Sequence, residues 1–315
     1  MVPIIPNNAS RLHALRTLNE HSHITWSTAF APDGTLASAS YDGTVRLWDP
    51  PTGQVIQTLR ANGGSFYCVA WSSEGVLAFG GDDGMVWIWD PNLGQLVQQL
   101  QGHTQKVTSV AFSRTGSLLA SSGYEGSIWI WNTDDGQAAG VVRGVEQGSL
   151  DGLAFSPRDN RTLAYIGIGG SVEVWDLSQR AVVRSLRGAS EVGCIAFSPN
   201  GRLLAGGCND GTIQLWDAIT GQSVRSLQGH AASVMSVAFS PDGQLIASGD
   251  KGQQCDHWSP GLETLRLWNV STGKCLSTLV GFVSLPGYFG LAFSPDGGLI
   301  SAGCLDNTVR LWATS

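Results

Sequence analysis

The sequence contains 315 residues, of which 42% are hydrophobic and 14% are charged, and 41 residues are glycine. This composition is typical of many short strands joined by tight turns. The net charge is -7 and no block of Lys or Arg occurs, which argues against nucleic-acid binding, because that function needs a basic surface along the phosphates.

A short segment that ends in tryptophan, first seen as Thr44–Trp48, recurs along the sequence. Its seven copies end at Trp48, Trp89, Trp131, Trp175, Trp216, Trp268 and Trp312. The successive spacings are 41, 42, 44, 41, 52 and 44 residues. A period in this range indicates a repeat architecture rather than two unrelated domains.

The first predicted strand precedes the first complete repeat. Residues 1–10 are expected to form an N-terminal tail, and a strand is predicted at Leu12–Leu18. Leu18 lies 12 residues before Phe30, the same spacing that separates Leu100 from Phe112. This is the register of the last strand of a unit. We therefore expect residues 11–315 to form one closed ring in which residues 11–18 complete the last sheet, since closure protects strand edges.

The first complete unit contains four predicted strands, each of them short, rich in apolar or β-branched residues and bounded by turn residues. They are Ile24–Phe30, Thr35–Ser40, Thr44–Trp48 and Val55–Leu59. A Pro-Asp-Gly turn at residues 32–34 and an Asp-Gly hairpin at residues 42–43 separate the first three strands. Both turns recur in later units, so the whole sequence is predicted to be all-β.

Two units depart from the repeat. Unit four has Gly169 where the hairpin aspartate belongs. In unit six, 29 residues separate Phe239 from Trp268, against 18 to 20 in every other unit. The excess lies in the second hairpin, at about residues 250–262, so the hairpin aspartate of unit six is expected to be lost.

The repeated segments resemble those of the WD40-repeat family. Unit three matches the family pattern in order, with Gly102-His103, Val110-Ala111-Phe112, Leu119-Ala120-Ser121 and Ile128-Trp129-Ile130-Trp131. The resemblance covers about residues 11 to 313. It implies a seven-bladed β-propeller with four antiparallel strands per blade, which agrees with the count of strands. Segments such as Ala-Phe-Ser-Pro-Asp-Gly also resemble bacterial WD40 proteins that work beside signalling ATPases and kinases.

The resemblance further implies that a His, a Ser, an acidic residue and the Trp are hydrogen-bonded within a blade. The matching sets are His21, Ser38, Asp42 and Trp48 in blade 1; His103, Ser121 and Trp131 in blade 3, with Glu125 in the Asp position; and His230, Ser248 and Trp268 in blade 6. A shared network satisfies buried polar groups. A catalytic triad would instead need an exposed serine in a cleft. These sets are therefore interpreted as structural, and no catalytic residue is predicted.

Partners of WD40 proteins usually bind the top rim, which is formed by the connections between blades and by the second hairpins. One family position lies four residues before the aromatic residue that ends the first strand, and another lies just before the hairpin aspartate. The first position holds Trp26, Tyr67, Thr108, Asp151, Gly193, Met235 and Phe289. The second position holds Tyr41, Asp82, Tyr124, Ile168, Asn209 and Leu305.

Large apolar side chains at these positions are concentrated in blades 7, 1 and 2, as Phe289, Leu305, Trp26, Tyr41 and Tyr67. The two longest loops of the top rim flank this sector and add His257, Trp258 and Tyr288. Exposed aromatic clusters and long loops are typical of binding sites. We predict a partner segment across blades 6, 7, 1 and 2. The alternative is that some of these side chains close the mouth of the channel as part of the core.

Other chemistry is sparse in the sequence. Cys255, Asp256 and His257 form the one candidate cluster of metal ligands, and a zinc site needs three or four ligands, so no metal or cofactor is predicted. No apolar run reaches the roughly 18 residues of a membrane span, and the N-terminus lacks the basic segment of a signal peptide. The six cysteines contain no CxxC pair. A cytoplasmic protein without membrane contact is therefore expected.

The preferred function is a non-catalytic scaffold that holds a protein or peptide, as a subunit or regulatory module of a larger complex. The net negative charge and the aromatic rim favour an apolar or partly basic peptide. The alternative is a hydrolase or lyase with its site at the central channel, for which Asp151 and Asp82 would be the acids. The sequence specifies no oligomeric state.

Overall fold

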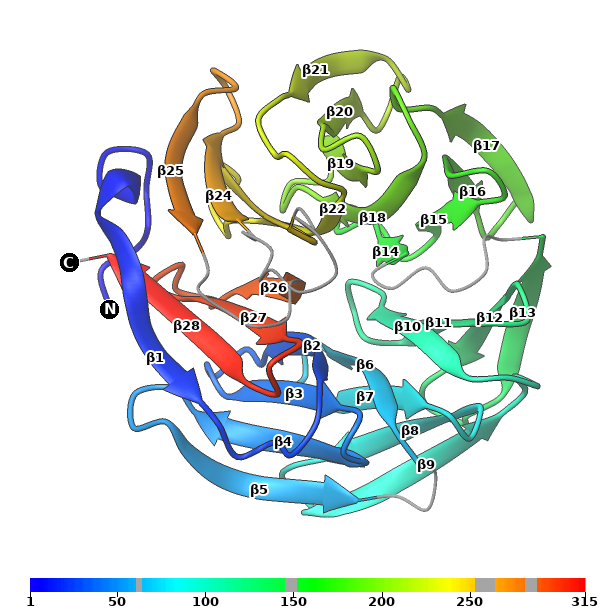
Figure 1. The fold of residues 1–315 in the computed structure, drawn as a ribbon. Helices are drawn as coiled ribbons and strands as arrows, with labels where there is room; N and C mark the ends of the chain where they lie inside the picture. Colours follow the sequence, from blue (N-terminus) through cyan, green and yellow to red (C-terminus); the bar gives the residue numbers. More distant parts are fainter. Residues whose placement is uncertain (61–63, 145–151, 253–263, 281–287, 315) are drawn as a thin grey trace, which may run out of the picture.

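The computed structural model describes residues 1–60, 64–144, 152–252, 264–280 and 288–314, with the backbone alone at residues 288 and 289. Within these ranges, 28 strands form seven sheets of four strands, and the sheets stand around a central axis (Figure 1). The chain is thus an all-β seven-bladed propeller with four antiparallel strands in each blade, as predicted.

The blades are numbered along the sequence, and the strands of each blade run from the inner to the outer edge of its sheet. Blade 1 contains β2 (Thr25–Phe30), β3 (Leu36–Ser40), β4 (Thr44–Asp49) and β5 (Gln54–Arg60), and blade 2 contains β6 (Phe66–Trp71), β7 (Leu77–Gly81), β8 (Met85–Asp90) and β9 (Gln95–Gln101). Blade 3 contains β10 (Val107–Phe112), β11 (Leu118–Gly123), β12 (Ser127–Asn132) and β13 (Ala138–Arg143), and blade 4 contains β14 (Leu153–Phe155), β15 (Thr162–Gly167), β16 (Ser171–Asp176) and β17 (Ala181–Leu186).

The remaining blades follow the same order. Blade 5 contains β18 (Val192–Phe197), β19 (Leu203–Cys208), β20 (Ile213–Asp217) and β21 (Ser223–Leu227), and blade 6 contains β22 (Val234–Phe239), β23 (Leu245–Asp250), β24 (Thr264–Asn269) and β25 (Cys275–Val280). Blade 7 contains β26 (Tyr288–Phe293), β27 (Ile300–Cys304), β28 (Val309–Thr314) and β1 (Leu12–Leu18). In blade 1 the predicted strand ends agree with the structure to within one residue.

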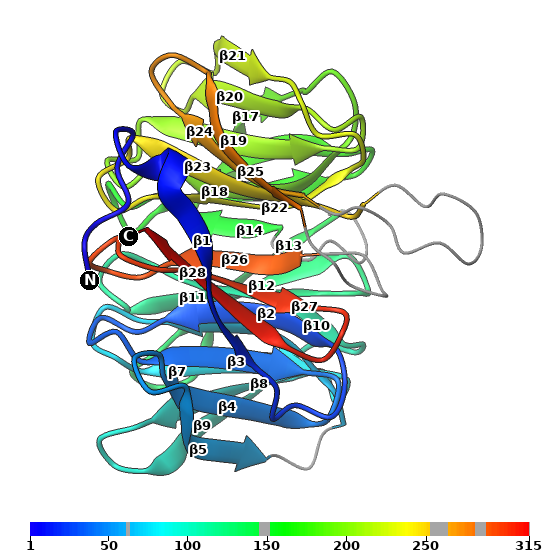
Figure 2. The same ribbon diagram turned by 60° about the vertical axis from the view of Figure 1, so that its left-hand side comes forward.

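The ring closes through the N-terminal strand. β1 pairs antiparallel with β28, from Leu12 opposite Thr314 to Leu18 opposite Val309 (Figures 1 and 2). The segment before it contains the short 3-10 helix η1 (Ala9–Arg11) and packs against the ring. Ile4 and Ala9 are buried in one cluster with residues of blades 6 and 7, and the Ile4 N–H donates to the Gly297 carbonyl over 2.8 Å.

The hydrophobic core lies mainly between neighbouring blades. In one cluster, Ala37 and Leu47 of blade 1 pack with Phe66 and Leu77 of blade 2. The second strands carry small residues where the next blade approaches closely. A side-chain carbon at Gly207 on β19, for example, would lie 2.6 Å from the Val234 side chain of blade 6. Alternating small and large side chains let twisted sheets pack face to face.

Outer strands add polar contacts across several seams between blades. Arg16 on β1 donates to the carbonyls of Thr52 and Pro51 in blade 1, over 2.8 and 3.0 Å. Arg225 on β21 contacts the carbonyls of Thr272 and Ser271 in blade 6 in the same way. Blade 3 has Gly140 at the corresponding place on β13, where a cavity of about 320 Å³ opens beside blade 4.

Candidate partner-binding site

The polar side chains that recur in blade 1 form one buried network. His21 Nδ1 lies 2.8 Å from Asp42 Oδ2, and His21 Nε2 lies 2.7 Å from Ser38 Oγ. The Trp48 indole N–H donates to the same Ser38 oxygen over 2.8 Å. Burial lowers the pKa of His21, and the hydrogen bond to Asp42 offsets this only in part. The imidazole is therefore neutral at pH 7.

The carboxylate of this network is charged. Burial opposes ionisation of Asp42, but hydrogen bonds from His21 and Thr44 outweigh burial and lower its pKa below the ordinary value. Blade 3 contains the same arrangement, with His103 Nδ1 2.5 Å from Glu125 Oε1 and His103 Nε2 2.8 Å from Ser121 Oγ. The Trp131 indole donates to Ser121 over 2.8 Å.

Blade 6 corrects one expectation from the sequence. The hairpin aspartate was expected to be lost to the insertion, but Asp250 at the end of β23 takes its place. Its Oδ2 lies 3.0 Å from His230 Nδ1, and the Thr264 hydroxyl donates to the same oxygen over 2.8 Å. His230 and Trp268 both contact Ser248 Oγ, at 2.6 and 2.7 Å. The longer hairpin therefore changes the register of the aspartate without removing it.

These networks are closed to a substrate. The central serines Ser38, Ser121 and Ser248 are each 0% exposed. Each accepts a tryptophan N–H while it contacts a histidine, so its oxygen is committed within the blade. A nucleophile has to reach a bound substrate, which these buried serines cannot do. The networks therefore serve to fix the strands and hairpins of each blade.

The inner strands carry an irregularity at the top rim. In blade 1, Thr25 pairs with Ser40 and Ser27 pairs with Ala39, so Trp26 is an extra residue in the ladder. The extra residues of five blades are Trp26, Tyr67, Thr108, Gly193 and Met235. A β-bulge turns a side chain out of the regular alternation. The first rim position of these blades thus coincides with a bulge.

Blade 7 follows a different register. Phe289, which the sequence places at the same position, pairs directly with Gly303, and the irregularity falls between Phe289 and Ala292. Gly290 within it has a φ of 54° and approaches blade 1 so closely that a side-chain carbon would lie 2.5 Å from the Ser27 Cα. Glycine is therefore required at this contact.

Aromatic side chains of blades 1 and 2 meet on the top rim. The ring centroid of Tyr67 lies 5.8 Å from that of Tyr41 and 6.2 Å from that of Trp26. Tyr67 is 7% exposed and Tyr41 is 41% exposed, so one ring supports the other from below. His23 extends the group, with its ring 4.9 Å from Tyr41.

Blade 3 contributes a cation to the same group. The ammonium of Lys106 lies 5.0 Å from the centroid of Tyr67 and 4.6 Å from that of Tyr124. We call Trp26, Tyr41, Tyr67, Lys106 and Tyr124 the rim cluster. Burial raises the pKa of Tyr67, and the hydrogen bond from its hydroxyl to Asp82 raises it further, so the phenol stays neutral and donates over 2.8 Å.

Lys106 and His23 are not among the site residues predicted from the sequence. A positional signal for Lys106 exists, because its carbonyl accepts the Tyr124 N–H over 2.9 Å, just as the Ile24 carbonyl accepts the Tyr41 N–H over 2.8 Å. The residue two places before each bulge is therefore a third rim position. It holds Ile24, Ser65, Lys106, Glu191 and Ser233 in blades 1, 2, 3, 5 and 6.

The structure does not describe every predicted rim residue. His257 and Trp258 lie outside the described residues, as does Asp151. Tyr288 and Phe289 are described only as backbone of β26. Leu305 is half-buried in the turn between β27 and β28. The structure thus assembles the predicted residues of blades 1 and 2 into one group.

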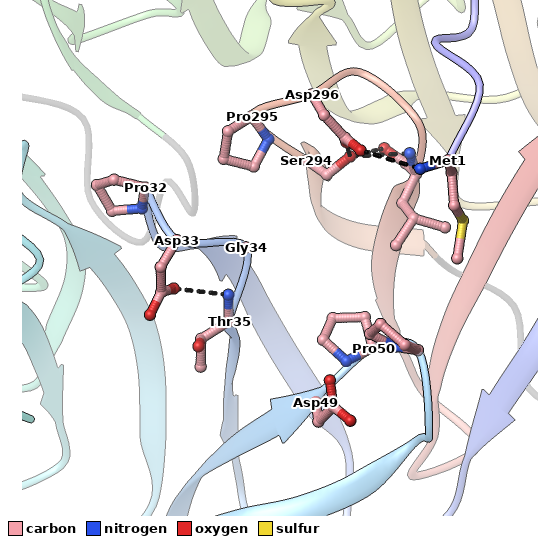
Figure 3. Close-up of a pocket in the computed structure, with 12 residues that line it drawn as sticks. Met1, Pro32, Asp33, Gly34, Thr35, Asp49, Pro50, Ser294, Pro295 and Asp296 are labelled. Atoms are coloured by element: carbon pink, nitrogen blue, oxygen red, sulfur yellow. Dashed lines mark hydrogen bonds and ion pairs between the residues drawn. The ribbon is translucent and has the colours of Figure 1, made fainter.

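A cavity of about 340 Å³ lies on the opposite rim, between the first hairpins of blades 7 and 1 (Figure 3). The three aspartates that line it already have partners. Asp33 accepts the Thr35 N–H over 2.8 Å, and Asp296 faces the Met1 ammonium at 3.5 Å. Ligand sites usually have a few polar groups that converge on the ligand. The aspartates of this lining are instead used within the protein, as in an ordinary surface hollow.

Over the described ranges, no three His, Cys, Asp or Glu side chains converge in a way that could hold a metal ion. Nor does that part of the chain contain a helix with the length and apolar character to cross a membrane.

Comparison with known proteins defines the class. A family model for the WD domain, G-beta repeat, matches residues 13–49, 53–90 and 273–313, and one for the IFT122 first beta-propeller matches residues 75–265. The chain therefore belongs to the WD40-repeat β-propeller family. Members of this family are usually non-catalytic and typically bind proteins.

Individual relatives are similar at modest identity. The chain is 24% identical over 309 residues to the transcriptional corepressor LEUNIG_HOMOLOG of Arabidopsis thaliana, which covers 97% of the chain and 32% of that protein. It is 31% identical over 123 residues to protein tipD of Dictyostelium discoideum, which covers 39% of the chain and 18% of that protein. With myosin heavy chain kinase C of the same organism it shares 30% identity over 81 residues, which cover 26% of the chain and 10% of the kinase. The chain spans a third or less of the length of these relatives.

Proposed function

We propose that the chain is a non-catalytic scaffold that binds a protein or peptide segment across blades 6, 7, 1 and 2 of its top rim. The observation that supports this most directly is the rim cluster, in which Tyr67 holds Tyr41 and Trp26 at the rim. Aromatic side chains with little rotational freedom contribute most of the binding energy at protein interfaces. Phe289, Leu305, Tyr288, His257 and Trp258 extend the proposed surface into blades 7 and 6.

The proposal includes a role as a subunit or regulatory module of a larger complex. It is supported by a homologous kinase and a homologous corepressor, each of which carries its WD40 region within a longer chain. A cytoplasmic location and work beside signalling proteins of a bacterial type belong to the same proposal. The bacterial type is supported by the recurring Ala-Phe-Ser-Pro-Asp-Gly segments. The location is supported by the cysteines, since four of the five that the structure describes are buried free thiols.

The alternative, an enzyme at the central channel, has less support. Its candidate acid Asp82 is held by the Tyr67 hydroxyl and by the Ser65 N–H, at 2.8 and 3.1 Å. A general acid or base must be free to exchange a proton with a substrate. A screen for hydrolase and lyase activity separates the two functions.

The experiment uses random segments of about 12 residues, long enough to cross several blades, displayed with both ends joined to a carrier. Segments selected on the wild-type protein are measured against a Trp26→Ala, Tyr41→Ala double variant. We expect affinity to fall at least tenfold, about 1.4 kcal/mol. An Ile56→Ala, Val224→Ala variant removes apolar side chains that are 58% and 51% exposed on outer strands and is expected to bind as the wild type does. Equal affinity in all three proteins would refute the site.

A further inference from the structure

The surroundings of Lys106 hold its ammonium group in place but do not neutralise its charge. The ammonium lies over the rings of Tyr67 and Tyr124, at 5.0 and 4.6 Å from their centroids. Among the residues that the structure describes, Lys106 forms no ion pair with a carboxylate. Ring faces attract a cation but leave its net charge in place. The side chain is half-buried, so its charge is accessible from the rim.

The position of this cation is fixed from several sides. The Lys106 carbonyl accepts the Tyr124 N–H over 2.9 Å, which joins the two residues at the backbone. Tyr67 is held by its hydrogen bond to Asp82 Oδ1, while Asp82 Oδ2 accepts the Ser65 N–H over 3.1 Å. Much of the conformational entropy that a free lysine loses on binding is therefore already lost in the unbound protein.

We propose that Lys106 binds the side-chain carboxylate of an Asp or Glu within the partner segment, whose neighbouring apolar side chain packs on Tyr41 and Trp26. The proposal rests on the proposed function and specifies the chemistry of the partner. An ammonium donates hydrogen bonds to a carboxylate, and such charge-assisted bonds are stronger than neutral ones. The adjacent aromatic surface favours an apolar neighbour, since Tyr41 is 41% exposed.

This assignment reverses the partner charge that the composition suggests. The net charge of -7 favours a partly basic peptide at long range. At the rim cluster, however, a basic side chain would face the Lys106 ammonium, and repulsion between close like charges disfavours it. At physiological ionic strength, salt screens the interaction between charges that lie more than about 8 Å apart. The nearby Lys106 charge therefore determines specificity more than the net charge of the protein does.

The arrangement of the cluster favours an internal acidic residue over a chain terminus. Trp26 and Tyr41 belong to blade 1, whereas Lys106 and Tyr124 belong to blade 3, with the ammonium 4.6 Å from the Tyr124 centroid. A terminal carboxylate would end the segment at Lys106, whereas an internal Asp or Glu lets the segment continue and cover Tyr124 as well.

The test compares selections from the same doubly tethered library on the wild type, Lys106→Met and Lys106→Glu. We expect Asp and Glu to be enriched beside an apolar residue on the wild type, no acidic preference on Lys106→Met, and Lys or Arg in their place on Lys106→Glu. In a segment selected on the wild type, replacing the acidic residue by its amide should weaken binding about tenfold to the wild type and leave binding to Lys106→Met unchanged.

The control variant is Lys274→Met, which removes an exposed lysine from the opposite rim and should keep the acidic preference. Thermal unfolding of each variant verifies that the fold is retained. Enriched segments without acidic residues overturn the role of Lys106 while the scaffold function stands. A preference seen only in a library with free C-terminal carboxylates overturns the internal occupant. If no segment is enriched on the wild type, both the scaffold function and this proposal fail.

Discussion

A buried histidine beside a buried carboxylate links the stability of a blade to pH. In blade 1, the pKa of His21 lies below its ordinary 6.5 because burial disfavours the charged ring. Between these two values the unfolded chain binds a proton that the folded chain does not. The free energy of unfolding is therefore greatest above pH 6.5 and falls as the pH decreases. The lowered pKa of Asp42 acts in the same direction below its ordinary 3.8.

We predict that His21→Gln flattens this dependence. Chemical denaturation of the wild type between pH 7.5 and 5 should show a loss of stability as the pH falls, and the variant should lose less over the same range, because one buried imidazole no longer needs to stay neutral. His103 keeps a residual slope, since burial lowers its pKa too.

His13→Gln serves as the control for this measurement. His13 lies exposed on β1, so its replacement should leave the wild-type slope unchanged. Parallel slopes in the wild type and His21→Gln would show that the buried ring does not carry the pH dependence.

At this scale the sequence predicted the recurring His, Ser and Trp sets but not Asp250 or Lys106. The His and Ser residues of these sets lie 17 or 18 residues apart, and the structure places each set in one network. Asp250 lies at the end of β23, earlier in the hairpin than its counterpart Asp42, so spacing alone could not identify it. The role proposed for Lys106 depends on its contacts with rings in two different blades. Such contacts arise from the packing of sheets, which the local sequence does not reveal.

At the scale of the elements, the outer strands differ in how they join neighbouring blades. Arg16 and Arg225 donate hydrogen bonds across their seams, whereas Gly140 on β13 leaves an open seam beside Trp175 and Leu177. A side-chain carbon at Gly140 would meet no atom within 4 Å. A strand glycine without a packing role raises the conformational entropy that folding must overcome.

We predict that Gly140→Ala raises the free energy of unfolding by about 0.5–1 kcal/mol, because alanine restricts the unfolded chain and meets no obstacle in the folded one. Gly206→Ala on β19 is the matched substitution. Its side-chain carbon would lie 2.8 Å from the Trp216 ring and 2.9 Å from Val192, so it should destabilise the protein. Denaturant titrations measure both, and a loss of stability in Gly140→Ala would contradict the open seam.

The bulges inside the inner strands were harder to predict than the strands themselves. The strands of blade 1 agree with the sequence because its turns contain Pro, Asp and Gly at the expected places. The extra residue at Trp26 or Tyr67 leaves no composition signal, since a bulge is defined by pairing with another strand. In blade 7 the irregularity lies between Phe289 and Ala292, where Gly290 packs against blade 1. The local sequence does not predict this contact either.

At the scale of the whole molecule, one strand joins the first residues of the propeller to the last. β1 pairs with β28 over its whole length, and Leu18 packs with Leu36, Trp48 and Leu311. This cluster connects blade 7 with blade 1 at the point where the ring closes. The sequence predicted closure correctly, because the register of Leu12–Leu18 matched the outer strands of complete units.

We predict that Leu18→Ala destabilises the protein by about 2–5 kcal/mol, the usual loss for a buried leucine. Leu18 is 3% exposed, whereas Leu15 on the same strand is 39% exposed, and Leu15→Ala should change stability by less than about 0.5 kcal/mol. Thermal and denaturant unfolding measure both variants. Equal effects would mean that β1 contributes edge pairing alone and not core packing.

The seam between blades 7 and 1 also sets the order in which a working surface can arise during synthesis. The Thr28 hydroxyl of β2 donates to the Gly290 carbonyl of β26 over 2.5 Å and lies 2.9 Å from the Ser301 hydroxyl of β27. A nascent chain therefore carries blade 1 with an uncovered flank until blade 7 has been synthesised. A partner that spans blades 7 and 1 would bind only after blade 7 has packed against blade 1, so its capture would report closure of the ring.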